Sequence, residues 1–521
     1  MKLLFVSNPA HGQINNLMSI AHELVLRGHD VHVCTGDRLA NRVRKIGALA
    51  GAPDRIHFHG CGSGAAVDDL TVLAHQQPEL FHTRARHPPG ELVSYLNLVC
   101  EHTEPGGDNY RDTCFKVRDV CLEVAPDMII VDNFSPFAVD GVRLSKRKYM
   151  LSSPGAACAV AKDVSPFKYP LPLCGADGSP ASRKGIRMVW NNFAFIAWWL
   201  RWCFTHPWPK ARRAFRKDVL GLEPVDIVCD SFMTPVAGTV KENVAAISFN
   251  VAGLDLYPPE AYHPDVFFVG PCYPPVRTAQ SEGIDFARQS QEAAAILDKA
   301  AAAAAQTAAA ASSDEEHDPV KDWLDEAQSA GGEVIYINMG SIFYYTLEEY
   351  NQLILAVSDL HDANPALRVL LKVPALSDEI QPIPPATDLP SFVRRESWLP
   401  SIQTVLEHPV VKIAVHHGGG NSFNEALSYG LPQFVLSQWG ETHDIAAYVR
   451  AHDIGVTSDT SPKLVREDIV VKLDELLRDY AKFKKNCNRW QLRTVQAGGT
   501  RVAADIIELH ARQASLPDDD E

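Results

Sequence analysis

A strand–helix–strand pattern in the first 35 residues constrains the fold of this chain more than any other feature. The apolar runs KLLFVSN and HDVHVCT each predict a buried strand. Between them, apolar residues recur at helical spacing and form one stripe: Ile14, Leu17, Met18, Ala21, Leu24 and Val25. Gly28 stands where such a helix would end. Because the second strand follows the helix almost at once, the pattern predicts a parallel sheet and an α/β fold.

The carboxyl edge of that sheet is the expected place for a functional site. In open parallel sheets, ligands bind beyond the carboxyl ends of the strands. Another buried-strand pattern, APDMIIVDNF, ends in the polar residues Asp132 and Asn133. The loop SNPAHGQINN, which follows the first strand, contains His11 and Gln13. We therefore expect Asp132 and Asn133 on the same edge of the sheet as the loop that contains His11.

The chain is too long, at 521 residues, for one ordinary domain, and its character changes near residue 270. We expect residues 1–270 to form one α/β domain and residues 271–320, which are rich in alanine, to form a linker or insert. The strand patterns GEVIYINMGS, ALRVLLKV and VVKIAVHH then predict a second α/β domain over residues 321–483. Residues 484–521 contain a helical stretch, expected to pack back on the N-terminal domain, and an acidic tail. Two domains with facing edges would leave a cleft between them.

Charge and cysteine content narrow the class of protein. The formal net charge of −15 argues against nucleic acid as a partner, because a nucleic-acid binder needs a basic face. The 11 cysteines include no C-x-x-C pair, which indicates reduced thiols. No signal peptide and no run of about 18 apolar residues is recognisable. We therefore expect a cytoplasmic protein.

Two segments are open to more than one interpretation. The stretch MVWNNFAFIAWWLRWCF, residues 188–204, is rich in tryptophan and precedes the basic run KARRAFRK, residues 210–217. It fits a helix in peripheral contact with a membrane, a wall around an apolar ligand, or core packing. The triplet His57, His59 and Cys61 imitates a metal site. Since alternation along a strand produces the same spacing, we expect no metal there.

The most informative segment is KIAVHHGGGNSFNEAL in the second half. A buried strand delivers His416 and His417 to its carboxyl end, and three glycines then let the backbone turn sharply. We expect a helix to begin at Asn421 and Ser422, so that its amide groups and dipole form an anion site. Glu425, one helical turn later, can reach a diol. These features describe a cradle for phosphates and a ribose, and the lack of a Walker lysine or G-x-G-x-x-G disfavours an ordinary ATPase or dinucleotide site.

A longer set of residues surrounds this cradle. It comprises Trp398, Leu406, His408, Pro409, His417, Gly419, Asn421, Ser422, Glu425, Gly430, Pro432 and Trp439. In this spacing the segment resembles the nucleotide-sugar signature of the UDP-dependent family 1 glycosyltransferases. The loop after the first strand, the run RGHDV and the run YINMGS extend the likeness over nearly the whole chain. The resemblance implies the GT-B fold, in which two Rossmann-like domains face each other across a cleft.

The resemblance also implies which residues bind the nucleotide-sugar. Trp398 would stack on the uracil, and Glu425 would bond the ribose hydroxyls. Ser341, Asn421 and Ser422 would hold the diphosphate. The full expected set is Ser341, Trp398, His417, Gly419, Gly420, Asn421, Ser422, Glu425, Glu441 and Thr442.

One of these residues has a competing interpretation, and two positions depart from the family. His417 would contact the α-phosphate, or would instead be a core histidine satisfied by a backbone carbonyl. Gly420 stands where the family has a tryptophan, and Glu441 and Thr442 stand where it has the sugar-binding Asp-Gln pair. A glutamate can still accept hydrogen bonds from sugar hydroxyls, but a threonine reaches less far than a glutamine. The donor sugar therefore stays open, with glucose as the family's expectation.

The catalytic base also departs from the family. The resemblance places the family's catalytic histidine at Gln13, and an amide cannot act as a base at neutral pH. His11 lies two residues earlier, just before a helix N-terminus that disfavours the imidazolium and keeps the ring able to take a proton. Asp132 matches the aspartate that orients the family's histidine. We predict a His11–Asp132 dyad; alternatively, His11 only packs in its loop and the protein catalyses poorly or uses another base.

The resemblance predicts an inverting hexosyltransferase that uses a UDP-sugar. The aromatic segment at residues 188–204 favours a lipophilic acceptor, such as a phenol, polyketide, terpenoid or sterol of secondary metabolism. No D-x-D motif follows a strand, so we expect no obligatory metal ion and no cofactor beyond the sugar donor. Two alternatives are a UDP-sugar epimerase of the same fold and a nucleotide-sugar-binding protein that has lost catalysis, which Gln13 and Thr442 would explain.

Overall fold

The computed structural model divides into two compact units, each built on one sheet. The structure describes residues 1–62, 105–156, 160–162, 164–169, 171, 185–231, 235–273, 318–340, 343–374, 381–399 and 401–514, apart from the side chain of His11. The first unit holds the described residues up to 273 together with residues 494–514. The second unit holds the described residues between 318 and 493.

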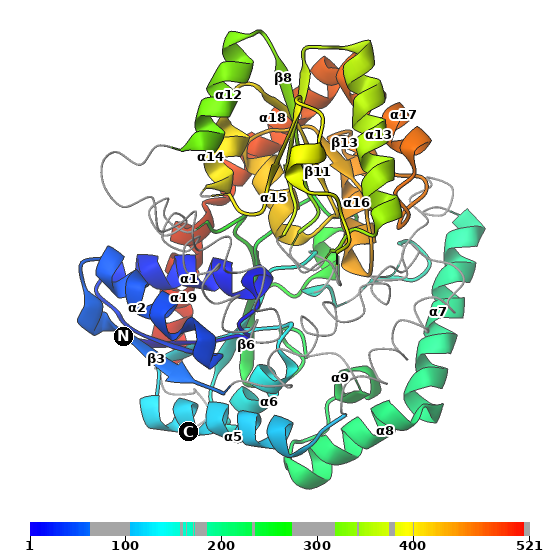
Figure 1. Cartoon of the computed structure of the whole chain (residues 1–521). Helices are drawn as coiled ribbons and strands as arrows, with labels where there is room; N and C mark the ends of the chain where they lie inside the picture. The colour runs from blue at the N-terminus through cyan, green and yellow to red at the C-terminus, as the bar shows by residue number, and fades with distance from the viewer. Residues whose placement is uncertain are drawn as a thin grey trace. The chain divides into compact units, whose positions relative to one another are not determined.

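The sheet of the first unit is parallel throughout its described strands. These are β1 (Lys2–Val6), β2 (Asp30–Thr35), β3 (Ile56–Gly60), β4 (Met128–Asp132), β5 (Tyr149–Ser153), β6 (Asn243–Ser248) and β7 (Val266–Phe268). Their order in space is β3-β2-β1-β4-β5-β6-β7 (Figure 1). The order reverses between β1 and β4, and such a switch point is where open α/β sheets bind ligands. The expected α/β class with a parallel sheet is confirmed for this unit.

Helices cover both faces of this sheet (Figure 1). One face carries α1 (His11–Leu26), α2 (Ala40–Leu49) and α19 (Gly499–Ala514), and the other carries α5 (Asp108–Val124) and α6 (Pro136–Leu144). Further helices are α7 (Gly185–Thr205), α8 (Pro207–Ala214) and α9 (Ile227–Ser231). Short turns of other helix types lie at Asp37–Leu39, Pro53–Arg55, Phe215–Val219 and Pro259–Ala261.

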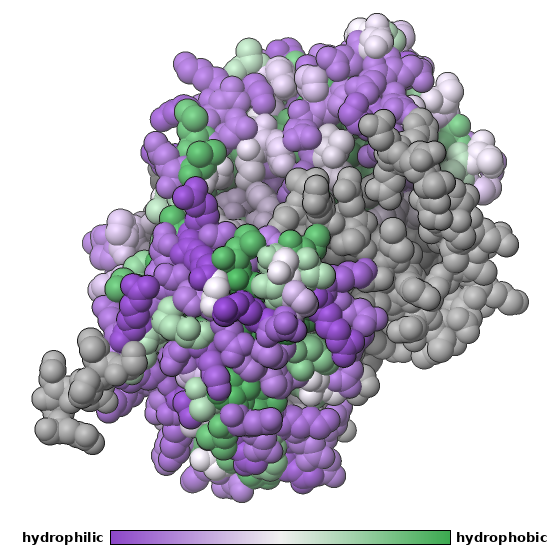
Figure 2. Space-filling view, turned by 90° about the vertical axis from the view of Figure 1, so that its left-hand side faces the viewer, coloured by the Kyte–Doolittle hydropathy of each residue, from purple (hydrophilic) through white to green (hydrophobic). Residues whose placement is uncertain are grey.

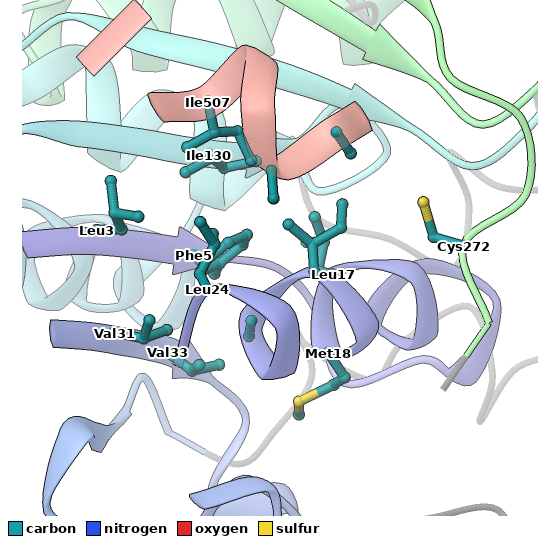
Figure 3. Packing of buried hydrophobic residues seen from close by; sticks show 14 of the residues in the cluster. Leu3, Phe5, Leu17, Met18, Leu24, Val31, Val33, Ile130, Cys272 and Ile507 are labelled. Carbon is teal, nitrogen blue, oxygen red and sulfur yellow. The ribbon is translucent and has the colours of Figure 1, made fainter. Parts of the chain in front are cut away.

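The first apolar stripe forms the centre of the core in this unit. All six apolar positions predicted for α1 are at most 2% exposed. Figure 3 shows side chains such as Leu17 of α1, Phe5 of β1 and Ile507 of α19 converging between the sheet and the two helices. Burying each such side chain stabilises the fold by roughly 1.5–3 kcal/mol. Gly28, with φ +84°, follows the end of α1 as expected.

The second unit repeats the architecture with a six-stranded parallel sheet in its described part. The strands are β8 (Glu333–Asn338), β9 (Leu367–Lys372), β10 (Val393–Glu396), β11 (Val411–His416), β12 (Gln433–Val435) and β13 (Gly455–Thr457), in the order β10-β9-β8-β11-β12-β13. The helices are α12 (Pro319–Ser329), α13 (Leu347–Ala363), α14 (Ile402–Glu407), α15 (Gly420–Ser428), α16 (Glu441–Ala451), α17 (Arg466–Arg478) and α18 (Tyr480–Ala497), with a short turn at Ala386–Asp388. Apolar residues of α13 and α17 pack on one face, and those of α12, α14 and α15 pack on the other.

The tryptophan-rich helix α7 packs partly into its own aromatic cluster. Trp199 and Trp202 are buried and pack with aromatic residues of α7 and α8 and apolar residues of α9, whereas Ile186 and Trp190 near the start of α7 are exposed. For the two buried tryptophans, the core-packing interpretation is therefore correct.

Two arginines of the basic run that follows α7 are buried inside the fold and do not contribute to an exposed charged patch. Arg212 and Arg216 are buried on the carboxylate of Asp140, which is 0% exposed, with Arg216 Nε 2.9 Å from Asp140 Oδ2. The electrostatic support for membrane contact is weaker than the sequence indicated, because these cations are used inside the fold. Within the described part of the chain, no helix is long and apolar enough to cross a membrane. The side of the molecule in Figure 2 presents mostly hydrophilic residues, with hydrophobic ones in small patches.

Candidate active site

The turn after β11 comes so close to the backbone of Thr442 that only glycine fits at Gly418. β11 lies between β8 and β12, so its carboxyl end is in the middle of the sheet. Gly418 has φ +89°, and a Cβ there would lie 2.8 Å from the carbonyl oxygen of Thr442. Any side chain at this position would therefore suffer both backbone strain and a clash. The sharp turn expected from the three glycines is present.

The helix after this turn begins one residue earlier than predicted. α15 begins at Gly420, and Gly419 is its N-cap residue, in an extended conformation and without a side-chain cap. The first helical hydrogen bond runs from the amide of Phe423 to the carbonyl of Gly419. Asn421 and Ser422 therefore lie in the first turn instead of capping the helix. The prediction was wrong because glycine also serves as an N-cap residue without a side-chain oxygen.

The two adjacent histidines have different surroundings. His416 is 2% exposed, accepts a hydrogen bond from the Gly418 amide at 3.0 Å and lies 2.8 Å from Gln433 Oε1. Burial lowers the pKa of His416 to about 4, so the ring is neutral. Both of its ring nitrogens have partners, which makes it a satisfied structural residue.

His417 lies between two glycine backbones. A Cβ on Gly340 would lie 2.6 Å from its Cε1, and a Cβ on Gly419 would lie 2.5 Å from its Nε2. Its Nδ1 is buried and has no hydrogen-bond partner among the residues that the structure describes. Burial, with a smaller effect from His416, lowers the pKa of His417 to about 3. The alternative of a histidine satisfied by a backbone carbonyl is not supported for Nδ1.

A half-buried base, Lys372, lies beside Trp398 and interacts electrostatically with a half-buried acid, Glu425. The Nζ of Lys372, the last residue of β9, is 5.1 Å from the centre of the Trp398 ring. Burial raises the pKa of Glu425 to about 7, although the charge of Lys372 opposes the shift. Burial also lowers the pKa of Lys372, with Glu425 opposing. Sequence reasoning missed Lys372; a charged residue at the end of the buried run ALRVLLKV was the available signal.

A small pocket joins two of the predicted residues to the sheet. Ser422 and Glu425 line it together with Asn338 of β8 and His416 of β11. The rest of its wall is Tyr336, Leu406, Ala414, Val415 and Ala426. The structure therefore brings the first turn of α15, and the acid one turn later, to the same pocket.

Glu441 and Thr442, the first two residues of α16, have different surroundings. The hydroxyl of Thr442, which is 0% exposed, accepts hydrogen bonds from the amides of Gln438 and Trp439 and donates one to the carbonyl of Trp439. The Thr442 hydroxyl thus holds the turn, and the sugar-binding role of Thr442 stays a prediction. Glu441 is half-buried, and burial followed by the charge of Asp444 raises its pKa to about 7. Of these two residues, Glu441 is thus the one whose side chain stays available to bind a sugar.

Asp132 lies at the carboxyl end of β4, beside the end of β1. It is 0% exposed, accepts a hydrogen bond from the Ser135 hydroxyl at 2.5 Å and lies 3.5 Å from the Ser7 hydroxyl. Burial raises its pKa to about 6, although these hydrogen bonds and that of the Phe134 amide lower it. Asn133, whose amide donates to the Ser153 hydroxyl, follows on the same edge.

Two predicted residues cannot be placed. The side chain of His11 and the whole of Ser341 lie outside the described residues. The backbone places His11 as the first residue of α1 and not in the preceding loop, since the helix begins there. The His11–Asp132 dyad and the part of Ser341 in binding the diphosphate therefore stay predictions.

Known proteins match both the sequence and the fold. Residues 309–493 match the family described as UDP-glucoronosyl and UDP-glucosyl transferase. Over 98% of this chain and 91% of the relative, the sequence is 29% identical to erythritol-mannosyl-transferase 1 of Mycosarcoma maydis. These matches identify the chain as a glycosyltransferase that is similar to this family over residues 309–493. The chain is an enzyme that transfers a sugar to a small acceptor.

Other relatives and solved structures agree with this assignment. Glycosyltransferase sdnJ of Sordaria araneosa is 24% identical over 87% of this chain and 82% of its own. The glycosyltransferase of kitacinnamycin superposes with a TM-score of 0.60 at 16% identity, covering 98% of this chain and 99% of that one. The calicheamicin glycosyltransferase CalG4 gives 0.56 at 15% identity, with 99% of both chains covered. At these identities the two structures establish the fold alone, and that fold is the predicted GT-B fold.

Proposed function

We propose that the protein transfers a hexose from a UDP-sugar to a hydroxyl group of a small acceptor, with inversion and without an obligatory metal ion. The environment of His417 carries the donor half of this proposal. Its ring is neutral, lies between Gly340 and Gly419, and has a buried Nδ1 without a partner in the described part of the chain. In the tautomer with the proton on Nδ1, the ring gains a charge-assisted hydrogen bond when a phosphate oxygen binds.

The rest of the donor would lie along α15. The amide groups and dipole of its first turn favour a diphosphate, both when bound and when it leaves as UDP. Glu425 has a desolvated carboxylate that gains two hydrogen bonds from ribose hydroxyls, and Trp398 offers an aromatic ring for the uracil. Lys372 would balance the negative charge of Glu425 in this low-dielectric region.

For the acceptor half, we propose His11 as general base. His11 would remove the proton from the acceptor hydroxyl while its oxygen bonds to the anomeric carbon and the bond from that carbon to the UDP oxygen breaks. Asp132 would accept a hydrogen bond from the second ring nitrogen and stabilise the imidazolium that forms. A pKa of about 6, raised by burial, leaves the Asp132 carboxyl mostly ionised at neutral pH.

The sugar and the acceptor have two candidates. The first is glucose transferred to a lipophilic hydroxyl compound; the exposed start of α7 supports it, but the buried Trp199 and Trp202 do not. The second is mannose transferred to a small polyol, because two relatives that match 98% of this chain are named erythritol-mannosyl-transferase 1, in Mycosarcoma maydis and Pseudozyma antarctica. The commitment of the Thr442 hydroxyl to its turn supports a donor preference different from that of the Asp-Gln members.

A matrix of separate reactions tests these proposals. UDP-glucose and nucleotide-linked mannose are each incubated with erythritol and with a panel of apolar phenols and alcohols, with and without a chelator. We expect one combination to give a hexosylated product by mass spectrometry, with equal turnover in the chelator. A changed sugar from UDP-sugar alone would indicate an epimerase instead. UDP binding in calorimetry with no UDP release in any reaction would indicate a binding protein and contradict the proposal.

A further inference from the structure

Three histidines and an aspartate gather on two neighbouring strands of the first unit. Asp30 and His32 belong to β2, and His57 and His59 belong to the edge strand β3. His32 is the register partner of His57 in the parallel pairing. Because side chains alternate along a strand, all four lie on the same face of the sheet. We call these residues the His/Asp cluster.

The face that carries the cluster is the one opposite α1 and α2. Val31 and Val33, the odd-numbered neighbours on β2, pack in the core with α1 and α2. The even-numbered residues therefore face α5, which contacts β2 and whose Glu123 acts electrostatically on His59. Asp30, His32 and His57 lie in the amino-terminal halves of β2 and β3, and His59 is the next-to-last residue of β3. Asp132, by contrast, lies at the carboxyl edge, so the cluster is separate from the proposed reaction site.

Three of the four side chains point one ligand atom each toward a common point. The Nε2 of His57 is 2.7 Å from Asp30 Oδ1, and the Nε2 of His32 is 3.5 Å from Asp30 Oδ2. One ligand atom from each of Asp30, His32 and His57 lies within 4.8 Å of the other two. Ligands of a tetrahedral zinc ion with bonds of about 2.0 Å are separated by about 3.3 Å. The separations of 2.7 Å and 3.5 Å, each to a different oxygen of Asp30, lie on either side of this value. The side chains of Asp30 and His57 are 37% and 42% exposed.

The fourth side chain orients the ring at the centre. The Nδ1 of His32 is 2.9 Å from the Nε2 of His59, so these nitrogens share a hydrogen bond. When His32 is the donor in this bond, its lone pair is on Nε2, on the side of Asp30. Apart from Asp30 Oδ2 at 3.5 Å, that buried Nε2 has no hydrogen-bond partner among the described residues. A metal-bound histidine usually has such an arrangement, with its second ring nitrogen held by a neighbour.

We propose that Asp30, His32 and His57 form a binding site for a divalent transition-metal ion of the zinc class, with His59 as the residue that orients His32. Two imidazoles and one carboxylate favour such an ion over Mg²⁺ or Ca²⁺, which prefer oxygen ligands. A fourth position stays open for water. The ion would join β2 to the edge strand β3 and stabilise the first unit. Cys61, the third member of the triplet noticed in the sequence, is buried against Cys34 and does not belong to the site.

Zinc titration of the metal-stripped full-length protein tests this proposal. Calorimetry should show one more equivalent of tightly bound zinc in the wild type than in His57→Gln, and zinc should raise the Tm of the wild type alone. Removing the orienting partner by His59→Gln should weaken zinc binding about 10–100-fold, the usual effect of such a partner. The matched control is His263→Gln, because His263 lies 3.5 Å from Asp265 in the same unit without a third ligand in the described residues.

Each result of these zinc titrations either supports or contradicts the proposed site. Equal zinc binding by the wild type and His57→Gln, or no zinc binding by the wild type at micromolar concentration, would overturn the site. If His57→Gln does not fold by circular dichroism, Asp30→Asn replaces it, since this variant removes one ligand charge and conserves shape. A loss of zinc binding in His263→Gln as large as that in His57→Gln would also overturn the assignment. None of these results depends on the proposed sugar transfer.

Discussion

Gly418→Ala tests whether the turn after β11 is as tightly constrained as its geometry indicates. The left-handed backbone, with φ +89°, should cost about 1–2 kcal/mol for a residue with a Cβ. The new Cβ would also lie 2.8 Å from the Thr442 carbonyl oxygen and 3.0 Å from Val435 Cγ1, an overpacking of roughly 1–3 kcal/mol. We therefore expect Gly418→Ala to lower the free energy of unfolding by about 2–5 kcal/mol.

Gly331→Ala is the matched control in the same unit. Gly331 also has a left-handed backbone, with φ +70°, but nothing lies within 4 Å of the position of its Cβ. It should show the backbone cost of about 1–2 kcal/mol alone. Urea unfolding of both variants, followed by tryptophan fluorescence, gives the difference that is due to the clash. Equal destabilisation of the two variants would refute the argument that the turn is closely packed.

The same pair of variants tests the function of the turn. A shift of the turn displaces the first residues of α15, and the loss of one hydrogen bond to a charged phosphate costs about 1.5–3 kcal/mol. UDP affinity by calorimetry should therefore fall about 10- to 100-fold in Gly418→Ala. Gly331→Ala should bind UDP like the wild type. An unchanged affinity in both would separate the turn from nucleotide binding.

Three further predictions concern charged and catalytic residues. His11→Ala should lower turnover by about 10²–10⁴-fold with unchanged UDP affinity, while Gln13→Ala keeps most turnover; substantial turnover in His11→Ala would exclude the dyad. Burial raises the pKa of Glu425 to about 7, and the ionised carboxylate accepts more hydrogen bonds than the protonated form. The affinity for UDP-glucose should therefore rise from about pH 6 to pH 8. In Glu425→Gln the affinity should no longer depend on pH over this range. Asp140→Ala should lower the free energy of unfolding by about 3–5 kcal/mol in a urea titration, because it leaves two buried arginines unpaired; a loss below about 1 kcal/mol would contradict this.

Periodic patterns in the sequence predicted most of the fold. The apolar stripe of α1, the glycine that follows it and the buried runs of β1, β4, β8 and β11 are each visible within one short segment, because burial of one helix face or one strand requires them. The order of residues around Trp398 and Glu425 was visible for the same reason, since a strand, a turn and a helix keep the residues of the proposed donor site close in sequence.

Contacts between distant segments could not be predicted from the sequence. The engagement of the Thr442 hydroxyl depends on how the backbone folds at Trp439, and the spacing alone does not determine that turn. Lys372 lies more than fifty positions before Glu425, and only the pairing of β9 with β8 and of β8 with β11 brings them to one edge. The His/Asp cluster likewise depends on the register of β2 against β3. In the sequence of β3 alone, the spacing of His57 and His59 could not be distinguished from the usual alternation of side chains along a strand.

The two adjacent histidines show how a strand end separates structure from function. His416 is the last residue of β11, and the sheet and the turn satisfy both of its ring nitrogens. His417 has left the strand, so its ring falls between glycine backbones with Nδ1 unpaired in the described part of the chain. Because burial keeps both rings neutral, with pKa values lowered to about 4 and about 3, neither brings a positive charge to a diphosphate. The diphosphate binding that we propose at this turn would then depend on hydrogen-bond donors and on the dipole of α15 rather than on histidine charge.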